Sequence, residues 1–356
     1  MTIKTFSIEY DAINSKNTFT NGDVINGRII VEASKTTVIS SLVFKAQGRA
    51  WVSWSEHYGP HHDQTYWQKE KYYDVKHHML RETRRDGTGV IGKGRHVFPF
   101  SFTIPDRKIP SSFKSFMGEI FHKLKAELKR SMKLTKKAKV RFMFVSKPDM
   151  DILGLMEPQY GCKTKSVLFG SGNVSMDVHT TRMAYKQGNN LVDVINRSSR
   201  SVKPKFVLYE KKSFFAQGRR RVYNNDILKE NTDECSGKKT VTKVIRLPGD
   251  LPPSILNCSI IKLEYRLKIY LDVKCASDPE VILPIVVLPT SEVPAMKQPP
   301  ASDGIGHEAF GSPSQTQWSM TPQHQAAFQP MDPPPPYGAH AMYPPAFDSE
   351  KNQTAL

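Results

Sequence analysis

Cysteine is scarce in this sequence: 356 residues include only Cys162, Cys235, Cys258 and Cys275. No two of them form a Cys-x-x-Cys pair, so the sequence predicts neither a zinc ribbon nor a dithiol redox pair. The first ten residues, MTIKTFSIEY, lack the apolar stretch of a signal peptide and have the pattern of a strand. Together these features predict a cytosolic protein in a reducing compartment.

Long apolar runs and catalytic motifs are also missing. The longest run, VILPIVVLP at 281–289, covers about half a bilayer span and is broken by proline, so no transmembrane helix is predicted. No Gly-x-Ser-x-Gly, His-Glu-x-x-His or phosphate-binding loop occurs. The histidines between positions 57 and 78 lie in a polar, aromatic-rich stretch without a helix to fix a ligand pair. We therefore expect no enzyme activity, no metal and no cofactor.

Acidic residues are too few to balance the basic ones. The chain has 51 Lys and Arg against 34 Asp and Glu, a net charge of +17. The residues after Thr290 include six acids and two bases, a net of −4, so residues 1–290 carry +21. Such a body is attracted to anionic lipid, phosphorylated peptide or nucleic acid. Nucleic acid is not expected as a partner, because no base-stacking motif or DNA-reading helix is visible.

What the sequence does contain is alternation of apolar and polar residues. In IKLEYRLKIYLDVK, 261–274, seven residues point to one side and seven to the other, which is typical of a strand with one buried face. The stretch VFPFSFTIPD, 97–106, repeats the pattern, and Pro99 indicates an edge strand or a bulge. Many such strands over about 290 residues predict an all-β fold with two immunoglobulin-like β-sandwich domains in tandem.

Domain boundaries follow from changes in composition. Alternation lapses between Lys147 and Val167, where Pro and Gly accumulate, so we place the first domain at 1–165 and the second at 166–290. Residues 291–356 hold 12 of the 25 prolines and no alternating strand. This segment cannot bury enough apolar area to offset its conformational entropy, so a disordered Pro-rich C-terminal tail is expected.

One segment is ambiguous. Residues 112–139 have apolar residues at helical spacing, yet they also alternate from Ile120 onward. Taken alone, the spacing slightly favours a helix, which would be basic, amphipathic and suited to a membrane surface. A strand of an ordinary sandwich remains the alternative.

The tail contains the motif Pro334-Pro335-Pro336-Tyr337. A proline run is a stiff, extended helix of three residues per turn, so little entropy is lost on docking and Tyr337 lies on the same face as Pro334. Pro-Pro-x-Tyr is the ligand pattern of WW domains, with Pro334, Pro335 and Tyr337 as the contact residues. The alternative is a proline-rich spacer with a chance tyrosine.

A second, weaker WW ligand is predicted at Pro344, Pro345 and Phe347. Phenylalanine keeps the ring but lacks the hydroxyl, so we expect weaker binding than at Tyr337. Two sites on one tail could engage tandem WW domains with avidity.

Two basic runs are candidate contacts for an anionic surface, either lipid or phosphorylated peptide. The alternative is that they are solvated strand faces and turns. The candidate residues are Lys123, Lys125, Lys129, Arg130, Arg219, Arg220 and Arg221.

Several stretches carry a family resemblance. VFKAQGRAWVSW and HVFPFSFTIPDRKIPSSF resemble the N-terminal arrestin domain, and KPKFVLYEKKSFFAQGRRR and LPPSILNCSIIKLEYRLKIYLDVK resemble the C-terminal one. With the Pro-Pro-x-Tyr tail, the chain is similar to the α-arrestins. The resemblance implies two arrestin-type sandwiches and an adaptor whose body recognises membrane receptors or transporters. It also implies a tail that recruits HECT-type ubiquitin ligases through their WW domains and promotes ubiquitination, endocytosis and endosomal sorting.

The resemblance carries three further expectations. Pro334, Pro335 and Tyr337 match the family's ligase-binding motif, the protein is expected in the cytoplasm and peripherally at plasma membrane and endosomes, and the ambiguous segment becomes a strand. The run from Gly188 to Asn196 is short for the family, which predicts a clipped or bulged strand. The rival interpretation is a membrane-surface or phosphopeptide-binding scaffold without ligase recruitment.

Overall fold

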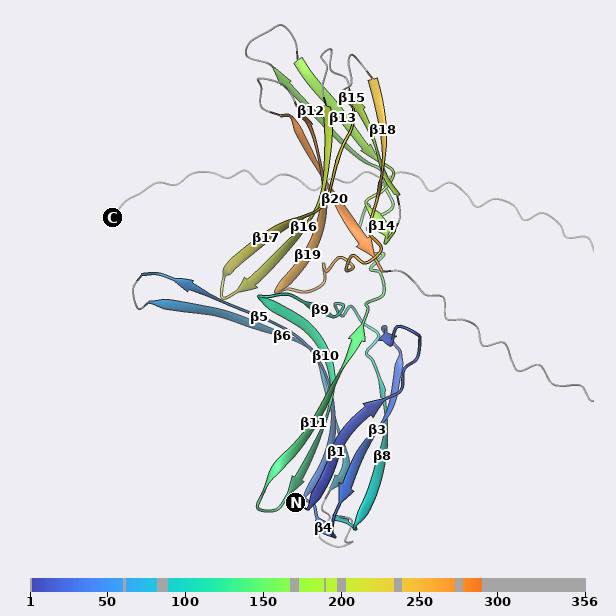
Figure 1. Cartoon of the computed structure of the whole chain (residues 1–356), viewed down its shortest axis with the longest axis vertical. Coiled ribbons are helices and arrows are strands. Elements are labelled where there is room, and N and C mark those ends of the chain that lie inside the picture. Colours follow the sequence, from blue (N-terminus) through green and yellow to red (C-terminus); the bar gives the residue numbers. More distant parts are fainter. Residues whose placement is uncertain are drawn as a thin grey trace, which may run out of the picture. The chain divides into compact units, whose positions relative to one another are not determined.

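The computed structural model describes residues 2–59, 62–81, 89–166, 173–188, 190–196, 203–233, 239–272 and 278–289. These residues form β-strands joined by turns and loops, and no helix occurs among them (Figure 1). It follows that no helix in this part of the chain is long and apolar enough to cross a membrane. The predicted all-β class is confirmed. Both tail motifs, including their prolines, Tyr337 and Phe347, lie outside the described residues.

The first sandwich pairs a three-stranded sheet, in the order β1-β3-β8, with a larger sheet in the order β2-β11-β10-β5-β6; β9 joins β10, and β4 pairs with β7. Neighbouring strands are antiparallel except β2 and β11. The strands are β1 (Ile3–Tyr10), β2 (Thr18–Phe19), β3 (Val24–Ala33), β4 (Thr37–Val38), β5 (Ser41–His57), β6 (Asp63–Arg81), β7 (Val90–Ile91), β8 (Gly94–Thr103), β9 (Phe113–Lys114), β10 (Gly118–Arg130) and β11 (Lys133–Phe144).

The second sandwich has a sheet in the order β12-β13-β15-β18 and a sheet in the order β14-β20-β19-β16-β17. Only β14 and β20 run parallel. The strands are β12 (Gln159–Ser166), β13 (Asn173–Thr180), β14 (Ala184–Lys186), β15 (Asn190–Asn196), β16 (Lys203–Ala216), β17 (Arg219–Asn231), β18 (Lys239–Arg246), β19 (Ile261–Asp272) and β20 (Glu280–Leu288). Lys165, where the sequence places the domain boundary, lies within β12, which pairs with β13 along its length.

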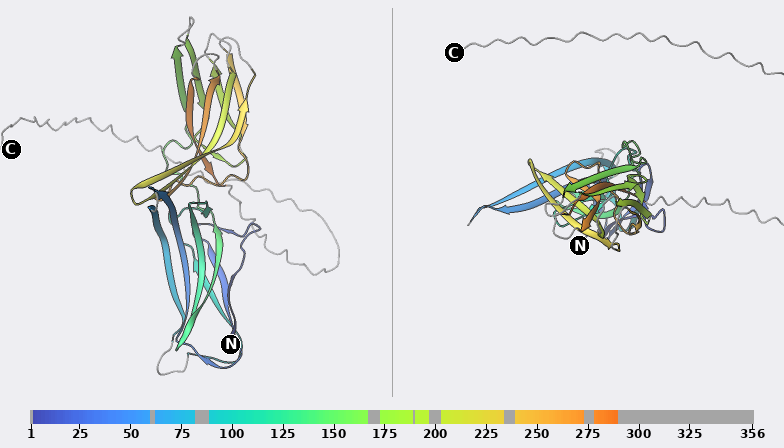
Figure 2. Two further views of the ribbon diagram at one scale, coloured as in Figure 1. Left: turned by 60° about the vertical axis from the view of Figure 1, so that its left-hand side comes forward. Right: turned by 90° about the horizontal axis from the view of Figure 1, so that it is seen from above.

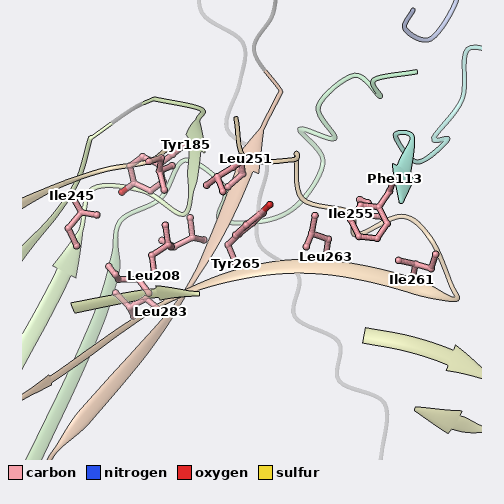
Figure 3. Packing of buried hydrophobic residues seen from close by; sticks show 14 of the residues in the cluster. Phe113, Tyr185, Leu208, Ile245, Leu251, Ile255, Ile261, Leu263, Tyr265 and Leu283 are labelled. Atoms are coloured by element: carbon pink, nitrogen blue, oxygen red, sulfur yellow. The ribbon is translucent and has the colours of Figure 1, made fainter. Parts of the chain in front are cut away.

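Strand β19 shows why alternation produces these sheets. Every second residue from Ile261 to Leu271 is buried, and the residues between them are half-buried. Burying one such side chain stabilises the fold by about 1.5–3 kcal/mol, so a one-residue slip would move a row of apolar groups into water. Tyr265 lies on the buried face and its hydroxyl donates to the carbonyl of Pro252 at 2.7 Å, which satisfies its polar atom (Figure 3).

The ambiguous segment forms β10 and β11, so the strand that the resemblance implied is confirmed and the helix that spacing alone favoured is wrong. Pairing decides the outcome. β10 pairs with β5 from Lys129 back to Gly118 and with β11 on its other edge, which satisfies its backbone hydrogen bonds and buries every second side chain. These contacts come from residues far away in the sequence, which a local pattern cannot report.

One finer expectation about a strand is also confirmed. Pro99 lies on β8, which pairs with β3 and forms the edge of its sheet. Because the outer side of an edge strand has no partner strand, proline can lack an N–H there without the loss of an interstrand hydrogen bond. The short run before Asn196 forms β15, and its register with β18 shifts between Leu191 and Asp193, where Val192 of β15 lies opposite two residues of β18. The extra residue thus belongs to β18, and a clipped or bulged strand in the short segment itself stays a prediction.

Two large clusters of buried side chains hold the sandwiches together. In the first sandwich, the ring of Phe44 from one sheet stacks on Phe100 from the other, with centroids 4.4 Å apart. The larger cluster fills the second sandwich and includes residues of the first, among them Val52, Trp54 and Phe113. Figure 3 shows Phe113 with Ile255 of this cluster.

Candidate functional site

The tail motifs predicted from the sequence fall outside the described residues. Pro334, Pro335 and Tyr337, and the weaker copy Pro344, Pro345 and Phe347, all lie beyond residue 289. Their role as WW ligands therefore stays a prediction. The predicted basic residues lie within the described residues, at three separate places.

The first place is the outer face of β10. Leu124 and Ala126 are fully buried against the core, so Lys123 and Lys125 project to the opposite face of the strand. Lys123 is paired with Arg141 on β11, and the next outward pair is Lys125 with Lys139. Neighbouring strands thus place cations opposite one another on this face, which is unfavourable unless anions intervene.

Part of this charge is neutralised by Glu127, also on β10. Its carboxylate binds Lys45 at 2.7 Å and Lys125 at 2.5 Å. Burial by itself would raise the pKa of Glu127, but the two ammonium groups outweigh it and hold the pKa at about 2. Lys45 and Lys125 are therefore already engaged by a carboxylate that stays ionised.

A second carboxylate neutralises the opposite end of the face. Arg141 binds Glu119 in a two-pronged pair, with nitrogen–oxygen distances of 2.8 and 2.9 Å, and Trp51 donates its indole N–H to the same carboxylate. The bond from Arg141 and then the one from Trp51 lower the pKa of Glu119 despite its partial burial. The positive charge of Arg141 is therefore largely balanced by the carboxylate of Glu119.

Lys123 differs from its neighbours. No carboxylate in the described part of the chain forms an ion pair with it, and its ammonium lies 4.8 Å from the centre of the Phe121 ring. Burial lowers the pKa of Lys123, and four nearby cations lower it further. They are Arg49, Lys125, Lys139 and Arg141. An anion beside Lys123 would relieve this repulsion, so the predicted anionic contact is chemically reasonable here.

The second place is the end of β10. Lys129 is exposed and Arg130 half-buried just before the turn to β11. They share the strand of Lys123 but lie at the end of the sandwich, not in the middle of the sheet face (Figure 1). The continuous basic run of the sequence is thus divided into a sheet-face group and a turn group.

The third place is the start of β17, which follows the turn at Gln217 and Gly218. All three arginines have partners in the protein. Arg221 forms an ion pair with Glu56 at 2.8 Å, and Arg220 donates to the hydroxyl of Ser213 at 3.0 Å. The guanidinium of Arg219 lies 6.0 Å from the ring of Tyr66. Their predicted role at an anionic surface stays untested.

Arg219 and Arg220 border an open depression of about 480 Å³. It is lined by Gln68 from β6 and by residues of the second sandwich, namely Phe215, Ala216, Gln217, Gly218, Arg219, Arg220 and Ile260. The depression combines two arginines with an otherwise mainly apolar lining, which suits an extended, partly anionic segment. A small metabolite would need a more enclosed site.

Sequence reasoning missed two carboxylates that connect β5 and β6 to the second sandwich. Glu56 accepts hydrogen bonds from Tyr58 at 2.6 Å and Trp54 at 3.0 Å, and these bonds, in that order, lower its pKa together with the ion pair to Arg221. Glu70 accepts from the backbone N–H of Ser259 at 2.8 Å and from its hydroxyl at 2.6 Å. The partners are separated by more than 160 residues, so no local pattern could have revealed them.

The histidines contribute no metal site among the residues that the structure describes, where no group of three His, Cys, Asp or Glu side chains is suitably placed. Within the β5–β6 hairpin, His57 instead pairs with Asp63. His77 is exposed on β6.

Comparison with known proteins agrees with this architecture. The profile of the arrestin (or S-antigen) N-terminal domain matches residues 6–151, and that of the C-terminal domain matches residues 170–291. Arrestin domain-containing protein 4 of Mus musculus is 27% identical over 292 residues, covering 77% of this chain and 69% of that protein. The Homo sapiens protein of that name is 28% identical over 291 residues, covering 76% and 68%.

Thioredoxin-interacting protein of Mus musculus is 27% identical over 301 residues, which cover 80% of this chain and 73% of that protein. The sequence motifs also predict a particular likeness to arrestin domain-containing protein 3, which these relatives do not address.

Proposed function

Because the chain belongs to the arrestin family, among the α-arrestins, we propose that this arrestin-type adaptor links membrane cargo to HECT-type ubiquitin ligases that contain WW domains. The cargo would be the cytoplasmic part of a receptor or transporter. Ubiquitin transfer would then direct the cargo to endocytosis and endosomal sorting, with the protein acting from the cytoplasm at plasma membrane and endosomes.

The observation that carries the proposal is the motif Pro334-Pro335-Pro336-Tyr337 in a chain with both arrestin domains. The prolines present an apolar ridge that is ordered before binding, and the tyrosine adds an aromatic ring with a hydroxyl. Such a short ligand is expected to bind one WW domain at about 1–100 µM, or roughly −8 to −5.5 kcal/mol. Tethering to cargo and a second contact at Phe347 would make this modest affinity effective.

The body supports the adaptor role through its surface rather than through a reaction centre. The depression beside β17 is open, and Arg219 and Arg220, which border it, have partners within the protein. Extended surfaces of this kind bind other macromolecules, whereas catalysis needs a pocket in which polar groups converge on a substrate.

We predict that Tyr337→Ala abolishes binding of the full chain to the tandem WW domains of a HECT-type ligase. The variant removes the ring and hydroxyl that fill the WW pocket, and binding should fall by more than about tenfold. Isothermal titration or pull-down with purified proteins measures the loss. Phe347→Ala should cause a smaller decrease, because it removes only the contribution of the weaker site to avidity.

Phe310→Ala is the matched control, since Phe310 is an aromatic residue of the same tail but lies far from both predicted WW ligands. It should bind as the natural chain does. If Tyr337→Ala also bound normally, the ligase half of the proposal would be refuted and a scaffold without ligase recruitment would be favoured. Proximity labelling in cells, comparing these two variants, would extend the test to the cargo.

A further inference from the structure

Three segments of the first sandwich meet at one of its ends. β4 pairs with β7 through Thr37–Ile91 and Val38–Val90, and the backbone N–H of Ser40, just after β4, donates to the carbonyl of Lys129 at 2.9 Å. The turn between β10 and β11 therefore lies beside the β4–β7 pair, as both figures of the whole chain show (Figures 1 and 2).

This end exposes large apolar side chains. Met132 is fully exposed (104%), Leu134 is 91% exposed, and Val38 and Val90 are 57% and 50% exposed. Single exposed apolar residues are common, but four at one end of a sandwich form a surface that water solvates poorly. Folding gains almost nothing from Met132 and Leu134, because neither is covered by other parts of the described chain.

Met132 is also unfavourable for the turn it occupies. Its backbone has φ = +54°, a left-handed conformation that glycine or asparagine adopts more easily than a side chain such as methionine. Neither turn geometry nor core packing therefore explains methionine at this position. A contact outside the chain would explain it.

Cations surround the apolar residues. Residues 33–40, 89–95 and 129–137 contain no Asp or Glu. Their basic residues are Lys35, Lys93, Arg95, Lys129, Arg130, Lys133, Lys136 and Lys137. Lys136 donates to the carbonyl of Ile3 at 2.8 Å and so also serves the fold. Arg95 lies opposite Glu32 and Lys137 opposite Glu127 on neighbouring strands, so the cations that remain for this end are Lys35, Lys93, Lys129, Arg130 and Lys133.

We propose that this end, the basic-apolar tip (Lys35, Val38, Val90, Lys129, Arg130, Met132, Lys133 and Leu134), inserts Met132 and Leu134 into the surface of bilayers that contain anionic lipid. The lysines and Arg130 then contact lipid headgroups, and the long stems of lysine reach them from the membrane interface. Apolar residues bordered by cations match a surface that is anionic outside and apolar beneath. The proposal does not depend on ligase recruitment, since no tail residue belongs to the tip.

Flotation of the full chain with vesicles tests the proposal. The natural chain should bind vesicles of phosphatidylcholine with added phosphatidylserine, bind pure phosphatidylcholine vesicles far less, and lose binding at high salt. Met132→Asn with Leu134→Ser should weaken binding by at least about tenfold, because each side chain loses its apolar contact with lipid. Lys129→Gln, Arg130→Gln and Lys133→Gln together should weaken it by about a hundredfold, at about fivefold per charge.

The matched control changes the same residue types elsewhere. Met150 and Leu153 are 55% and 92% exposed in the loop between β11 and β12, beside Asp149 and Asp151. Met150→Ser with Leu153→Ser should bind vesicles as the natural chain does. Thermal unfolding checks the fold: Met132→Asn should keep or raise the melting temperature, because asparagine suits the left-handed turn.

Three outcomes would overturn the proposal. The first is that the natural chain shows no preference for anionic vesicles, as expected if the tip binds a protein partner instead. The second is that the Met132→Asn, Leu134→Ser variant binds vesicles normally. The third is that the Met150→Ser, Leu153→Ser control loses vesicle binding to the same extent. Tyr337→Ala should bind vesicles normally, so failure of the tip and failure of ligase recruitment are distinguishable.

Discussion

At the scale of single residues, one buried histidine has a hydrogen-bond partner for each ring nitrogen. His122 is fully buried in the first sandwich, with its Nδ1 2.9 Å from the Tyr73 hydroxyl and its Nε2 3.2 Å from the carbonyl of Pro110. These distances fit a neutral ring that donates from Nε2 to Pro110 and accepts at Nδ1 from Tyr73. Burial lowers the pKa of His122 to about 4, although the bond to Pro110 opposes the shift.

The low pKa of His122 predicts acid sensitivity. The folded protein binds the proton only near pH 4, whereas the unfolded chain binds it near the ordinary value of 6.5. The contribution of neutral His122 to the free energy of unfolding is therefore fully present above pH 6.5, and it is lost as the pH falls from 6.5 towards 4. Between about pH 7.5 and pH 5, the free energy of unfolding should fall by about 2 kcal/mol from this residue, measured by urea denaturation.

His122→Leu should remove this pH-dependent loss within the same window, whatever its effect on stability at neutral pH. His77→Gln, at an exposed position on β6, should retain the loss. An unchanged pH profile for His122→Leu would show that another group causes the acid sensitivity.

At the scale of elements, close approach of strands sets strict requirements. β3 lies between β1 and β8, and Gly27 is paired with Tyr10 on one side and Phe100 on the other. A Cβ atom at Gly27 would collide with the carbonyl oxygen of Glu9 and with the Phe100 ring. The missing side chain is therefore what allows the Phe100 ring to lie over β3.

Gly27→Ala should accordingly destabilise the first sandwich by about 1–3 kcal/mol, because backbone or ring must move. Chemical denaturation of the full chain measures the change. Gly92→Ala is the matched control, since a Cβ there meets nothing within 4 Å. Equal stability of the two variants would contradict the clash at Gly27.

At the scale of the whole molecule, the buried clusters of the described residues extend from Ile3 to Leu288. Contacts between residues divide the chain into Met1–Ala295 and Met296–Leu356. The first unit has two large buried clusters of its own, so we expect it to be stable by itself.

A chain that ends at Ala295 should unfold within about 2 °C of the full chain, because it keeps every cluster residue of the described part. It should also lose binding to WW domains entirely. Calorimetry and pull-down measure the two properties. A chain that ends at Asp272 is the contrasting case: it lacks β20, whose Leu283 and Ile285 are buried, and should fail to fold cooperatively. A large decrease in melting temperature on removing the tail alone would refute the independence of the body.

The sequence by itself determined the all-β class, the tandem sandwiches and the edge position of Pro99. Each of these depends on local alternation, on proline's missing N–H or on segment length, which are properties of neighbouring residues. The same local information left β10 ambiguous, since its apolar residues fit two periods.

Tertiary structure decided which strands pair, and pairing with β5 and β11 made the ambiguous segment a strand. It also decided which cations are neutralised: Glu127 engages Lys125, and Glu56 engages Arg221 from another sandwich. Only folding brings Val38 and Val90 to the same end as Met132. Coulomb attraction, hydrogen bonding and burial act between atoms that are close in space, and distance along the chain does not report that closeness.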